Sequence, residues 1–532
     1  MKQTEENKGL DKWVFWPAII LLTIMILVGI FFHRQMGDML NSMLYWMADT
    51  FGWYVNLISL LCLILSVVFI IYKYGDLKIG GRDAQPDFKI FHWCAMSICG
   101  GIGTGLLFWA IGEPIYHFAE PPVAAGVKAF SREAGIFAIS QSMWDWSFVQ
   151  YAMYSLCAVA FAIVTYNCKK SLSFGSLVEQ VFGRPIPWLT TVIHGCTIFC
   201  LCIAVANSMG VGLLQTGAGV EAVFGVSQSY IVWLAISIVM GTIFIVSCTS
   251  GIRNGLKRIS SFTMYMFFAL LLYVVCFGNA EFIGKISVEG VGNLLDHWAS
   301  KTVITNVMAD QDIWPANFTI QYWTAFIVYS PVIGMFLSRM AKGRTIRQFV
   351  LVNVLVPSVF CCIWIGIFGG MTIHLQFEGI MDVWGAVNQY GMQSTVFQIL
   401  SSLPMGTAVT VFFLIAVCLS FCTLADPMSS VLATLCVRQL SVNDEAPRNI
   451  KIFMGILITV FSYLLVASGG ITAIKSMNIF IGLIMSFTMI LCVVAAFRLS
   501  ASNLAMNKEA GTKQQQIQKG GTEQRYCSEV NL

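Results

Sequence analysis

The stretch SICGGIGTGLLFWAIGEPIYHF, residues 97–118, decides how the rest of this chain is interpreted. It is apolar enough to cross a bilayer, yet it has glycine at positions 100, 101, 103 and 105, followed by Glu113. Glycine weakens a helix, and broken backbone at membrane depth persists only where it lines a cavity or an ion path. The segment is therefore predicted to form part of a transport site.

The composition is that of a polytopic membrane protein. Of the 532 residues, 57% are hydrophobic and only 11% are charged, whereas soluble domains carry about 25% charged residues. Because about 20 apolar residues span the hydrocarbon core, we expect an all-α protein with twelve transmembrane helices. Their predicted centres lie near residues 22, 62, 104, 150, 203, 239, 268, 328, 360, 415, 459 and 488.

The distribution of basic residues predicts the orientation. The two termini and the loops on their side of the membrane hold 25 of the 31 Lys and Arg residues. Cytoplasmic loops are enriched in Lys and Arg, so both termini are expected in the cytoplasm. The net charge of +4 reflects this topology and does not indicate a nucleic-acid partner.

Three regions follow from the polarity profile. Residues 1–12 form a cytoplasmic amino-terminal tail, residues 13–499 a single transmembrane domain, and residues 500–532 a cytoplasmic tail. The last segment is rich in Gln, Gly and Lys, which predicts disorder. Within the domain, residues 279–316 and 379–402 are expected to contain short amphipathic helices at the interface.

An internal repeat is predicted at approximately 90–278 and 317–499. The first span of each half carries an interruption, the glycines of span 3 and the pair Pro331 and Gly334 in span 8. Matching interrupted helices mark the binding site in inverted-repeat transporters. The alternative is that Pro and Gly are simply common in membrane helices.

Several function classes lack the motifs that they need. The sequence has no CxxC pair, no HxxxH or HExxH spacing and no GxxxxGK[ST] loop. A disulfide framework, a metal site, a bound cofactor and a built-in ATPase are therefore not expected. An intramembrane enzyme would need a nucleophile–base pair or metal ligands at membrane depth, which these spacings do not supply.

Aromatic residues recur in spans 4 and 8. They are Trp146, Tyr151 and Tyr154 in SMWDWSFVQYAMY, and Tyr322, Trp323, Phe326 and Tyr329 in QYWTAFIVY. A quaternary ammonium has no N–H to donate, so its recognition depends on ring faces, each worth about 1–2 kcal/mol when desolvated. The alternative is that these rings pack against neighbouring helices or belong to the aromatic belts at the membrane interface.

Two longer strings carry a family resemblance. GTGLLFWAIGEPIYHFAEPP (103–122) and SPVIGMFLSRMAKGRTIRQF (330–349) resemble the betaine/choline/carnitine transporter family, and the similarity extends across the twelve spans. The resemblance implies a LeuT-like five-plus-five inverted repeat in spans 3–12 and a homotrimer surrounded by lipid in the plasma membrane, the inner membrane of a bacterium. It also implies trimethylammonium substrates such as glycine betaine, choline, carnitine or γ-butyrobetaine.

The resemblance assigns residues to the substrate site. Its aromatic box falls on Trp146, Tyr151, Tyr154 and Phe326. Tyr116, Trp323 and Tyr329 fall at further positions near the substrate. Relatives read YWAWW where this chain reads YWTAF, so Ala325 stands in place of a Trp and reshapes the pocket.

The resemblance also bears on coupling. Sodium-driven relatives keep a Gly-x-Gly-x-Gly break, preserved here as Gly101, Gly103 and Gly105, and a Thr-Ser pair in span 10. In this chain Thr423 is retained, but Leu424 occupies the Ser position and offers no oxygen. A sodium-independent antiporter of the family places an Arg where this chain has Lys257.

We therefore expect sodium-independent exchange of substrate for product. A fixed ammonium would replace a mobile sodium ion, because two cations cannot share one site cheaply. The alternatives are that Lys257 is an ordinary loop cation and that the chain is a sodium- or proton-coupled symporter. A channel or osmosensor is less favoured, because the tail is short and rich in Gln.

Two acidic residues are candidates for tuning. Glu113 is costly in hydrocarbon, by about 2.5–3.5 kcal/mol, and it either steers cations or pairs with a basic residue. Asp145 precedes Trp146 directly, at a position where many relatives have His. An anion beside the box is expected to tune substrate preference.

Overall fold

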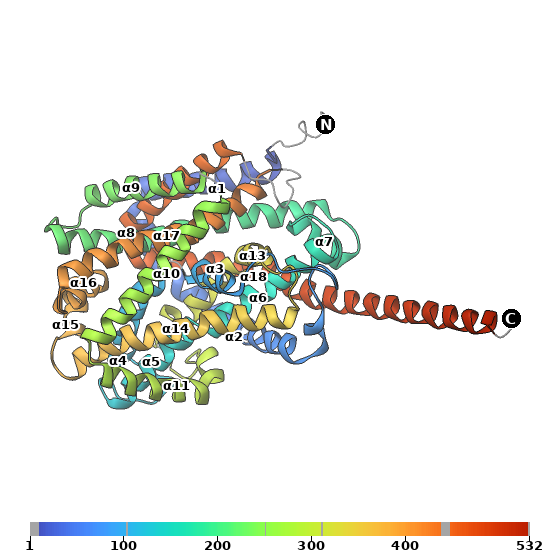
Figure 1. Ribbon diagram of the computed structural model, residues 1–532. Coiled ribbons are helices and arrows are strands. Elements are labelled where there is room, and N and C mark those ends of the chain that lie inside the picture. The colour runs from blue at the N-terminus through green and yellow to red at the C-terminus, as the bar shows by residue number, and fades with distance from the viewer. Residues whose placement is uncertain (1–9, 103–104, 250–251, 310–311, 438–446, 530–532) are drawn as a thin grey trace.

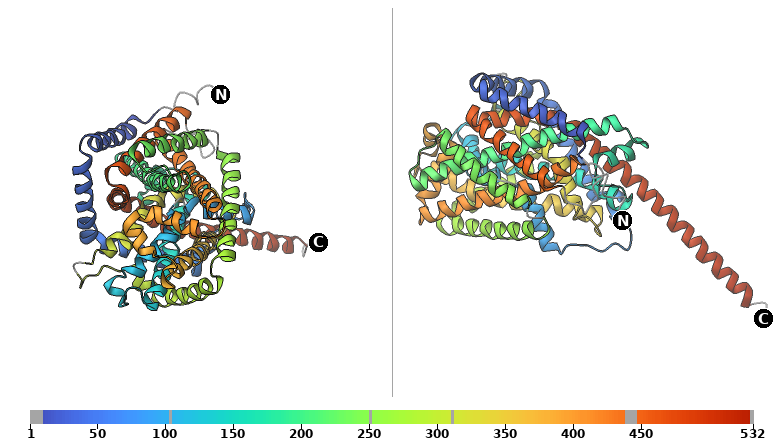
Figure 2. Two further views of the ribbon diagram at one scale, coloured as in Figure 1. Left: turned by 90° about the vertical axis from the view of Figure 1, so that its left-hand side faces the viewer. Right: turned by 90° about the horizontal axis from the view of Figure 1, so that it is seen from above.

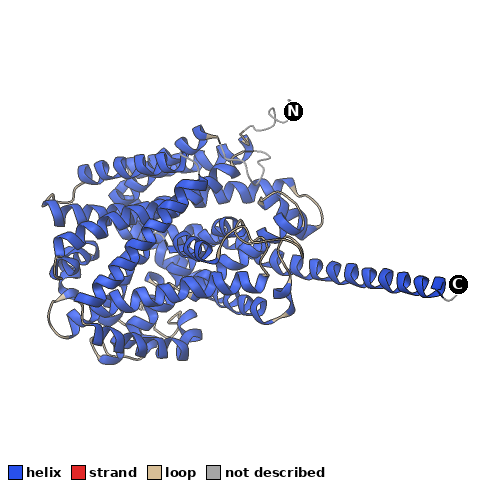
Figure 3. Ribbon diagram, viewed as in Figure 1, coloured by secondary structure: helices blue, strands red, loops and turns tan. Residues whose placement is uncertain are grey.

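The computed structural model describes residues 10–102, 105–249, 252–309, 312–437 and 447–529. In this part of the chain the regular structure is helical and contains no β-strand (Figure 3). Most helices pack into one bundle, and the end of the last helix projects from it (Figures 1 and 2). The predicted all-α class is confirmed.

The helices follow one another with short connections. Up to residue 302 they are α1 (Lys12–Phe31), α2 (His33–Ile71), α3 (Ile90–Ile102), α4 (Gly105–Ala119), α5 (Arg132–Asp145), α6 (Phe148–Ala162), α7 (Phe174–Phe182), α8 (Pro187–Phe224), α9 (Tyr230–Thr249), α10 (Ile252–Phe277) and α11 (Ala280–Thr302). The remainder are α12 (Trp314–Asn317), α13 (Thr319–Ser338), α14 (Ile346–Phe377), α15 (Val383–Tyr390), α16 (Met392–Ser402), α17 (Gly406–Leu435) and α18 (Arg448–Glu529).

The helices agree with most of the predicted spans. Eleven of the twelve predicted centres fall inside helices, and the one near residue 104 lies at the gap between α3 and α4. By length and apolar composition, eight of the described helices can cross a membrane. The bent pair Ser261–Phe277 and Ala280–Thr302 would make a ninth. The count falls short of twelve partly because span 3 is divided and because α18 combines the last two spans.

Exposed side chains show which helices face lipid. α1 and α9 present large apolar residues outward, among them Ile20, Leu21, Ile231 and Ile238. In contrast, α6 and α13 are buried along almost their whole length. A helix bundle that is apolar on its outside is a membrane protein. The two buried helices α6 and α13 carry Tyr151, Tyr154 and Phe326 of the predicted box.

Three breaks interrupt the inner helices, in addition to the one at Phe318 between α12 and α13. The first separates α3 from α4 at residues 103–104, which lie outside the described residues. The second separates α5 from α6 at Trp146 and Ser147, whose backbone angles are not helical. The third lies inside α18 at Gly470, with φ 55° and ψ −131°. A non-helical backbone inside a membrane bundle must line protein or a cavity.

The predicted interruption at Pro331 and Gly334 is wrong. α13 continues through both residues to Ser338, although the missing Pro331 N–H leaves the Ile327 carbonyl without its helical donor. Close packing of α13 against α6 and α18 holds the helix through this position. Gly334 serves close packing, since a Cβ there would lie 2.6 Å from Cys157 of α6. The helix instead breaks before α13, at Phe318.

The order of helices fits two similar halves. The first half contains α3–α4, α5–α6, α8, α9 and α10, and the second contains α13, α14, α17 and the two parts of α18. Short helices intervene at the same point in each half, α7 in the first and α15–α16 in the second. The inverted symmetry between the halves stays a prediction.

The regions outside the spans are also helical. α11 turns by 113° from α10, as expected for an amphipathic helix at the interface, and α15 and α16 form the second such segment. The backbone of α18 continues to Glu529, over the tail that its composition predicts to be disordered. Gln, Lys and Glu favour helix, and this local preference outweighs the scattered glycines in the structure.

Candidate substrate cavity

A cavity of about 100 Å³ lies between the broken helices. Its lining comes from α3, α4, α6, α8, α13 and α18, and from the break between α5 and α6. The residues that line it include Gly101, Gly105, Trp109, Trp146, Gln150, Tyr154, Asn207, Gln321, Tyr322, Ala325, Phe326, Tyr329, Lys475 and Asn478. The site therefore draws on both predicted halves.

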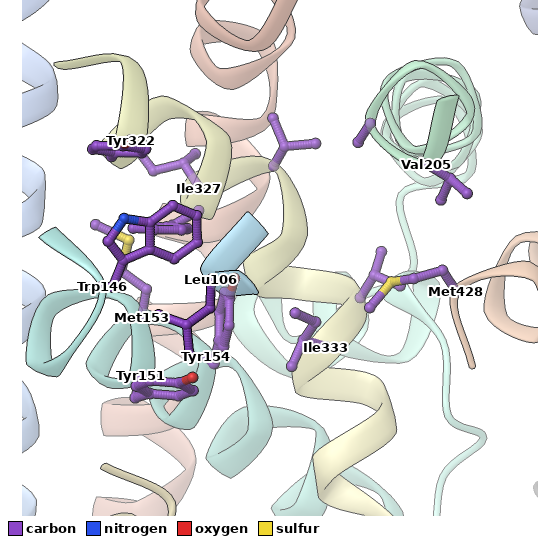
Figure 4. Close-up of a cluster of buried hydrophobic side chains, with 14 of the residues drawn as sticks. Leu106, Trp146, Tyr151, Met153, Tyr154, Val205, Tyr322, Ile327, Ile333 and Met428 are labelled. Carbon is purple, nitrogen blue, oxygen red and sulfur yellow. The ribbon is translucent and has the colours of Figure 1, made fainter. Parts of the chain in front are cut away.

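Aromatic rings form one continuous group in this lining. The ring centroid of Trp146 lies 5.1 Å from that of Tyr322 and 5.8 Å from that of Phe326. Tyr154 lies 6.5 Å from Phe326, edge to face. Figure 4 shows Trp146 between Tyr322 on α13 and Tyr154 on α6. These ring faces are suited to an organic cation.

The glycines of α3 and α4 make room for these rings. A Cβ at Gly105 would lie 2.6 Å from the Trp146 indole, and one at Gly101 would lie 2.7 Å from the Tyr151 ring. Real Cβ atoms do not approach ring atoms so closely. Glycine is therefore needed at positions 101 and 105 so that α3 and α4 can contact the aromatic rings closely. This role is separate from any effect of glycine on the helix.

Trp146 owes its position to the break between α5 and α6. It caps α5 with φ −110° and ψ 14°, and α6 starts two residues later. A helical wheel that runs through residues 142–154 therefore places Trp146 incorrectly relative to Tyr151 and Tyr154. The break lets the indole reach α13 while α6 presents Tyr154 to the cavity.

The carboxylate of Glu113 organises the box from behind. Its Oε2 accepts hydrogen bonds from Trp146 Nε1 at 2.8 Å and from the Tyr322 hydroxyl. Its Oε1 lies 3.2 Å from His117 Nε2. All four side chains are buried. Charge-assisted hydrogen bonds of this kind are stronger than neutral ones, so Glu113 fixes two of the rings that line the cavity.

His117 carries its proton on Nε2. Its Nδ1 accepts from Trp314 Nε1 at 3.1 Å, so Nδ1 must hold a lone pair. The proton is then on Nε2, which donates to Glu113 Oε1. The imidazole therefore connects the break before α13 to the acidic residue of α4.

A second carboxylate lies next to this network. Asp145 Oδ1 accepts from Gln141 Nε2 at 3.0 Å, and Oδ2 lies 3.8 Å from His117 Nε2. Among the described residues, Oδ2 has no hydrogen-bond donor. Lys301 of α11 acts electrostatically on Asp145, with its ammonium 4.2 Å from the Phe137 ring centroid. The buried lysine balances the buried acid.

Glu113, His117 and Asp145 also come close enough to suggest a metal site. Each offers one possible ligand atom, and these atoms lie within 4.8 Å of one another. However, both Glu113 oxygens already accept hydrogen bonds, and the free lone pair of His117 is used by Trp314. Because a metal would need these lone pairs, the group is better described as a hydrogen-bond network.

The residues predicted for the substrate site separate into two groups. The cavity lining contains Trp146, Tyr154, Phe326 and Tyr329. Three of the predicted residues do not line the cavity in the described part of the chain, namely Tyr116, Trp323 and Tyr151. Tyr151 packs behind Tyr154. Tyr116 contacts Trp384, with centroids 5.4 Å apart, and Trp323 Nε1 donates to the Thr302 carbonyl. Of the two tuning residues, neither Glu113 nor Asp145 lines the cavity; both lie behind it.

The predicted coupling residues are only partly described. Gly101 and Gly105 line the cavity, whereas Gly103 lies outside the described residues. The side chains of Lys257 and Leu424 also lie outside them. Thr423 is buried, and its hydroxyl donates to the Ser420 carbonyl of the same helix at 2.8 Å.

Several lining residues were not predicted from the sequence, among them Trp109, Gln150 and Lys475. Gln150 Nε2 donates to the Gly101 carbonyl and to the Tyr154 hydroxyl, which ties α6 to the helix break. Lys475 lies in α18, between the predicted centres of the last two spans. The available signal was that Lys475 is the only basic residue between Lys451 and Arg498, since intramembrane charges are functional candidates.

Comparison with known proteins gives relatives along nearly the whole chain. The chain is 27% identical to the osmo-dependent choline transporter BetT2 of Acinetobacter baylyi, over 93% of this chain and 72% of the relative. It is 26% identical to the ectoine/hydroxyectoine transporter of Virgibacillus pantothenticus, over 92% and 96%. It is 28% identical to glycine betaine transporter 1 of Vibrio parahaemolyticus, over 82% and 83%.

Solved structures are more distant. The structure of MhsT in complex with L-phenylalanine aligns with 80% of this chain and 99% of its own, at 11% identity and a TM-score of 0.44.

The family assignment rests on the sequence. The profile of the betaine/carnitine/choline family of transporters matches residues 13–504. The relatives are transporters and not enzymes, and several helices of this chain can cross a membrane. This chain belongs to the betaine/carnitine/choline transporter family and is a multi-pass membrane transporter.

Proposed function

We propose that this protein is a secondary transporter of trimethylammonium compounds, which bind in the cavity beside Trp146, Tyr154 and Phe326. The observation that carries the proposal is the continuous group of aromatic rings around a cavity at the helix breaks. Relatives named for choline and glycine betaine support the substrate class.

The chemistry of the site supports a cation. An alkylated ammonium has no N–H, so it gains little from the amide groups of the lining and more from ring faces. The anion at the edge of Trp146 adds to this attraction, because the hydrogen bond from Nε1 to Glu113 polarises the indole toward a more negative face. The buried Glu113 therefore acts through the ring, without contact with the substrate.

The transport mode that we propose is sodium-independent exchange of one substrate for a related product. Support comes from Leu424, which lacks the oxygen of a sodium ligand, and from Lys257 as a fixed cation. The Thr423 hydroxyl donates within its own helix, although its oxygen keeps a lone pair. Exchange would then need only that the loaded carrier reorients more readily than the empty one.

Coupled symport remains the second candidate. It is favoured by the buried pair Glu113 and Asp145 behind the box, because a carboxylate without a donor, such as Asp145 Oδ2, is a place where a proton would be stabilised. Proton binding there would reach the box through His117 and Glu113.

Reconstituted protein separates these modes. Labelled glycine betaine, choline, carnitine and γ-butyrobetaine are offered to proteoliposomes that are either empty or preloaded with unlabelled substrate, with and without a sodium or a proton gradient. Exchange predicts uptake only into preloaded vesicles and independent of either gradient. Concentrative uptake into empty vesicles that requires sodium or a proton gradient would contradict exchange and support symport.

The assembly in the cell is also proposed. We expect a homotrimer in the bacterial inner membrane with both termini in the cytoplasm, as the positive-inside rule and the family resemblance imply. Cysteine labelling from either side of the membrane, at a residue added to either tail, tests the orientation. Mass measurement of the purified protein tests the trimer.

A further inference from the structure

We propose that Lys475 makes the central cavity a site for zwitterions, in which the lysine binds the carboxylate while the aromatic rings bind the alkylated ammonium. This inference rests on the proposed function and narrows it to one class of substrate. It predicts that a betaine is preferred to a simple cation such as choline, although both carry the same trimethylammonium group.

The position of Lys475 is the first support. It lies in α18, five residues after the break at Gly470, and its side chain lines the cavity. Its ammonium is 5.4 Å from the ring centroid of Trp109 and 5.0 Å from that of Phe318. Trp109 in turn contacts Tyr322, with centroids 6.1 Å apart. Contacts through Trp109 and Tyr322 thus connect the lysine to the rings around Trp146, and both ends of this series line the same cavity.

The charge of Lys475 is incompletely compensated by the protein. Ring faces replace only part of the water that a lysine ammonium loses when it enters a membrane bundle. Among the described residues, no carboxylate oxygen lies within 4.0 Å of it. Glu113 acts on it electrostatically, but both oxygens of Glu113 already accept hydrogen bonds. The three N–H donors of Lys475 are therefore suited to an acceptor that a ligand brings.

The same wall of the cavity offers a second donor. Asn478 lies one turn after Lys475 on α18 and also lines the cavity. Its Oδ1 accepts from Asn207 Nδ2 at 2.7 Å, which leaves its own NH₂ group as the part that can face a ligand. In the described part of the chain, the Asn478 NH₂ group donates no hydrogen bond to another residue. An ammonium and an amide N–H together match the two oxygens of a carboxylate.

The alternative occupant is a cation that lacks a carboxylate. Such a substrate would have to share the cavity with Lys475, and two like charges in a poorly solvated site repel each other. The lysine therefore acts on specificity in two ways, by attracting zwitterions and by disfavouring simple cations. Glycine betaine and ectoine carry a carboxylate and choline does not, so the substrates named for the relatives differ in this property.

Binding to the purified full-length protein tests the inference. Calorimetric titration with glycine betaine and with choline compares wild type with Lys475→Met and Lys475→Arg. Lys285→Met on α11 is the matched control, because Lys285 pairs with Glu281 at the exposed surface. We expect wild type to prefer glycine betaine by roughly tenfold or more, the size of a hydrogen bond to a charged group.

The variants should change this preference in one direction. Lys475→Met should weaken glycine betaine binding by about tenfold and leave choline binding unchanged or stronger, whereas Lys475→Arg should keep the preference. Equal affinity of wild type for the two ligands, or an equal loss of both in Lys475→Met, would overturn the inference and leave the proposed function standing. A wild-type protein that binds neither ligand would contradict the proposed function itself.

Discussion

Trp146 Nε1 donates a 2.8 Å hydrogen bond to Glu113 Oε2, so a buried carboxylate of α4 holds the central ring of the cavity at the break between α5 and α6. The same oxygen accepts from the Tyr322 hydroxyl of α13. One acidic side chain thereby orients rings from two different helices. Its negative charge also strengthens the attraction of these rings for a cation.

The charge of Glu113 should therefore matter more than its shape. Glu113→Gln keeps a carbonyl oxygen and similar volume, but it removes the negative charge behind Trp146. We expect the affinity for trimethylammonium ligands to fall about tenfold, because charge-assisted hydrogen bonds are roughly twice as strong as neutral ones. Calorimetric titration measures the change. Glu289→Gln, at an exposed ion pair with Arg132, should have no effect; an equal loss in both variants would count against this role.

Gly105 should tolerate no side chain. Gly105→Ala places a Cβ 2.6 Å from the Trp146 indole, so the ring must leave its position in the cavity. We expect substrate uptake to fall at least tenfold, since a 1 Å displacement at a site is already costly. Gly284→Ala is the matched control, because a Cβ there meets nothing within 4 Å and alanine favours helix. Normal uptake by Gly105→Ala would show that the close contact is not needed.

Ala325 should set how large a substrate fits. It lines the cavity at a position where the family resemblance places a Trp. Ala325→Trp adds an indole to a cavity of about 100 Å³, so bulky ligands should lose more affinity than small ones. We expect carnitine to be affected more strongly than glycine betaine in competition for uptake. A uniform effect on both ligands would indicate general damage to the site.

Asp145 and Lys301 should depend on each other. Asp145→Asn removes the buried charge that acts on Lys301, and a buried lysine without its countercharge destabilises the fold. We expect a loss on the order of 3 kcal/mol, seen as a lower midpoint of thermal unfolding in detergent. The double variant Asp145→Asn with Lys301→Met should recover part of this loss. If the two losses simply add, the pair is not coupled.

Sequence periodicity predicted the helices well and the breaks only in part. Apolar runs of about 20 residues are a strong signal, and eleven predicted span centres fall in helices. The break at Trp146 and Ser147 was missed, because neither residue disfavours a helix by itself and tertiary contacts determine the bend. The break expected at Pro331 is absent, because the packing of α13 against α6 and α18 holds the helix together where the proline N–H is missing.

The residues of the candidate site were likewise predictable only in part. The 3.6-residue period places Tyr322, Phe326 and Tyr329 on one helix face, and all three line the cavity. Trp323, which directly follows Tyr322 in the sequence, turns away from this helix face and donates to the Thr302 carbonyl. Lys475 could not be placed from local sequence alone, because it is the packing of α18 against α8 and α13 that brings it to the cavity.

The central claim is that the rings at Trp146 bind the positive charge of the substrate. Titration of wild type and Trp146→Leu with glycine betaine and with 3,3-dimethylbutanoate, its neutral-carbon isostere, tests this directly, with the exposed Trp188→Leu as control. The account predicts that wild type binds glycine betaine at least about tenfold more tightly than the isostere, and that Trp146→Leu abolishes the difference while Trp188→Leu preserves it. Equal binding of the two ligands by wild type, or an unchanged preference in Trp146→Leu, would contradict it.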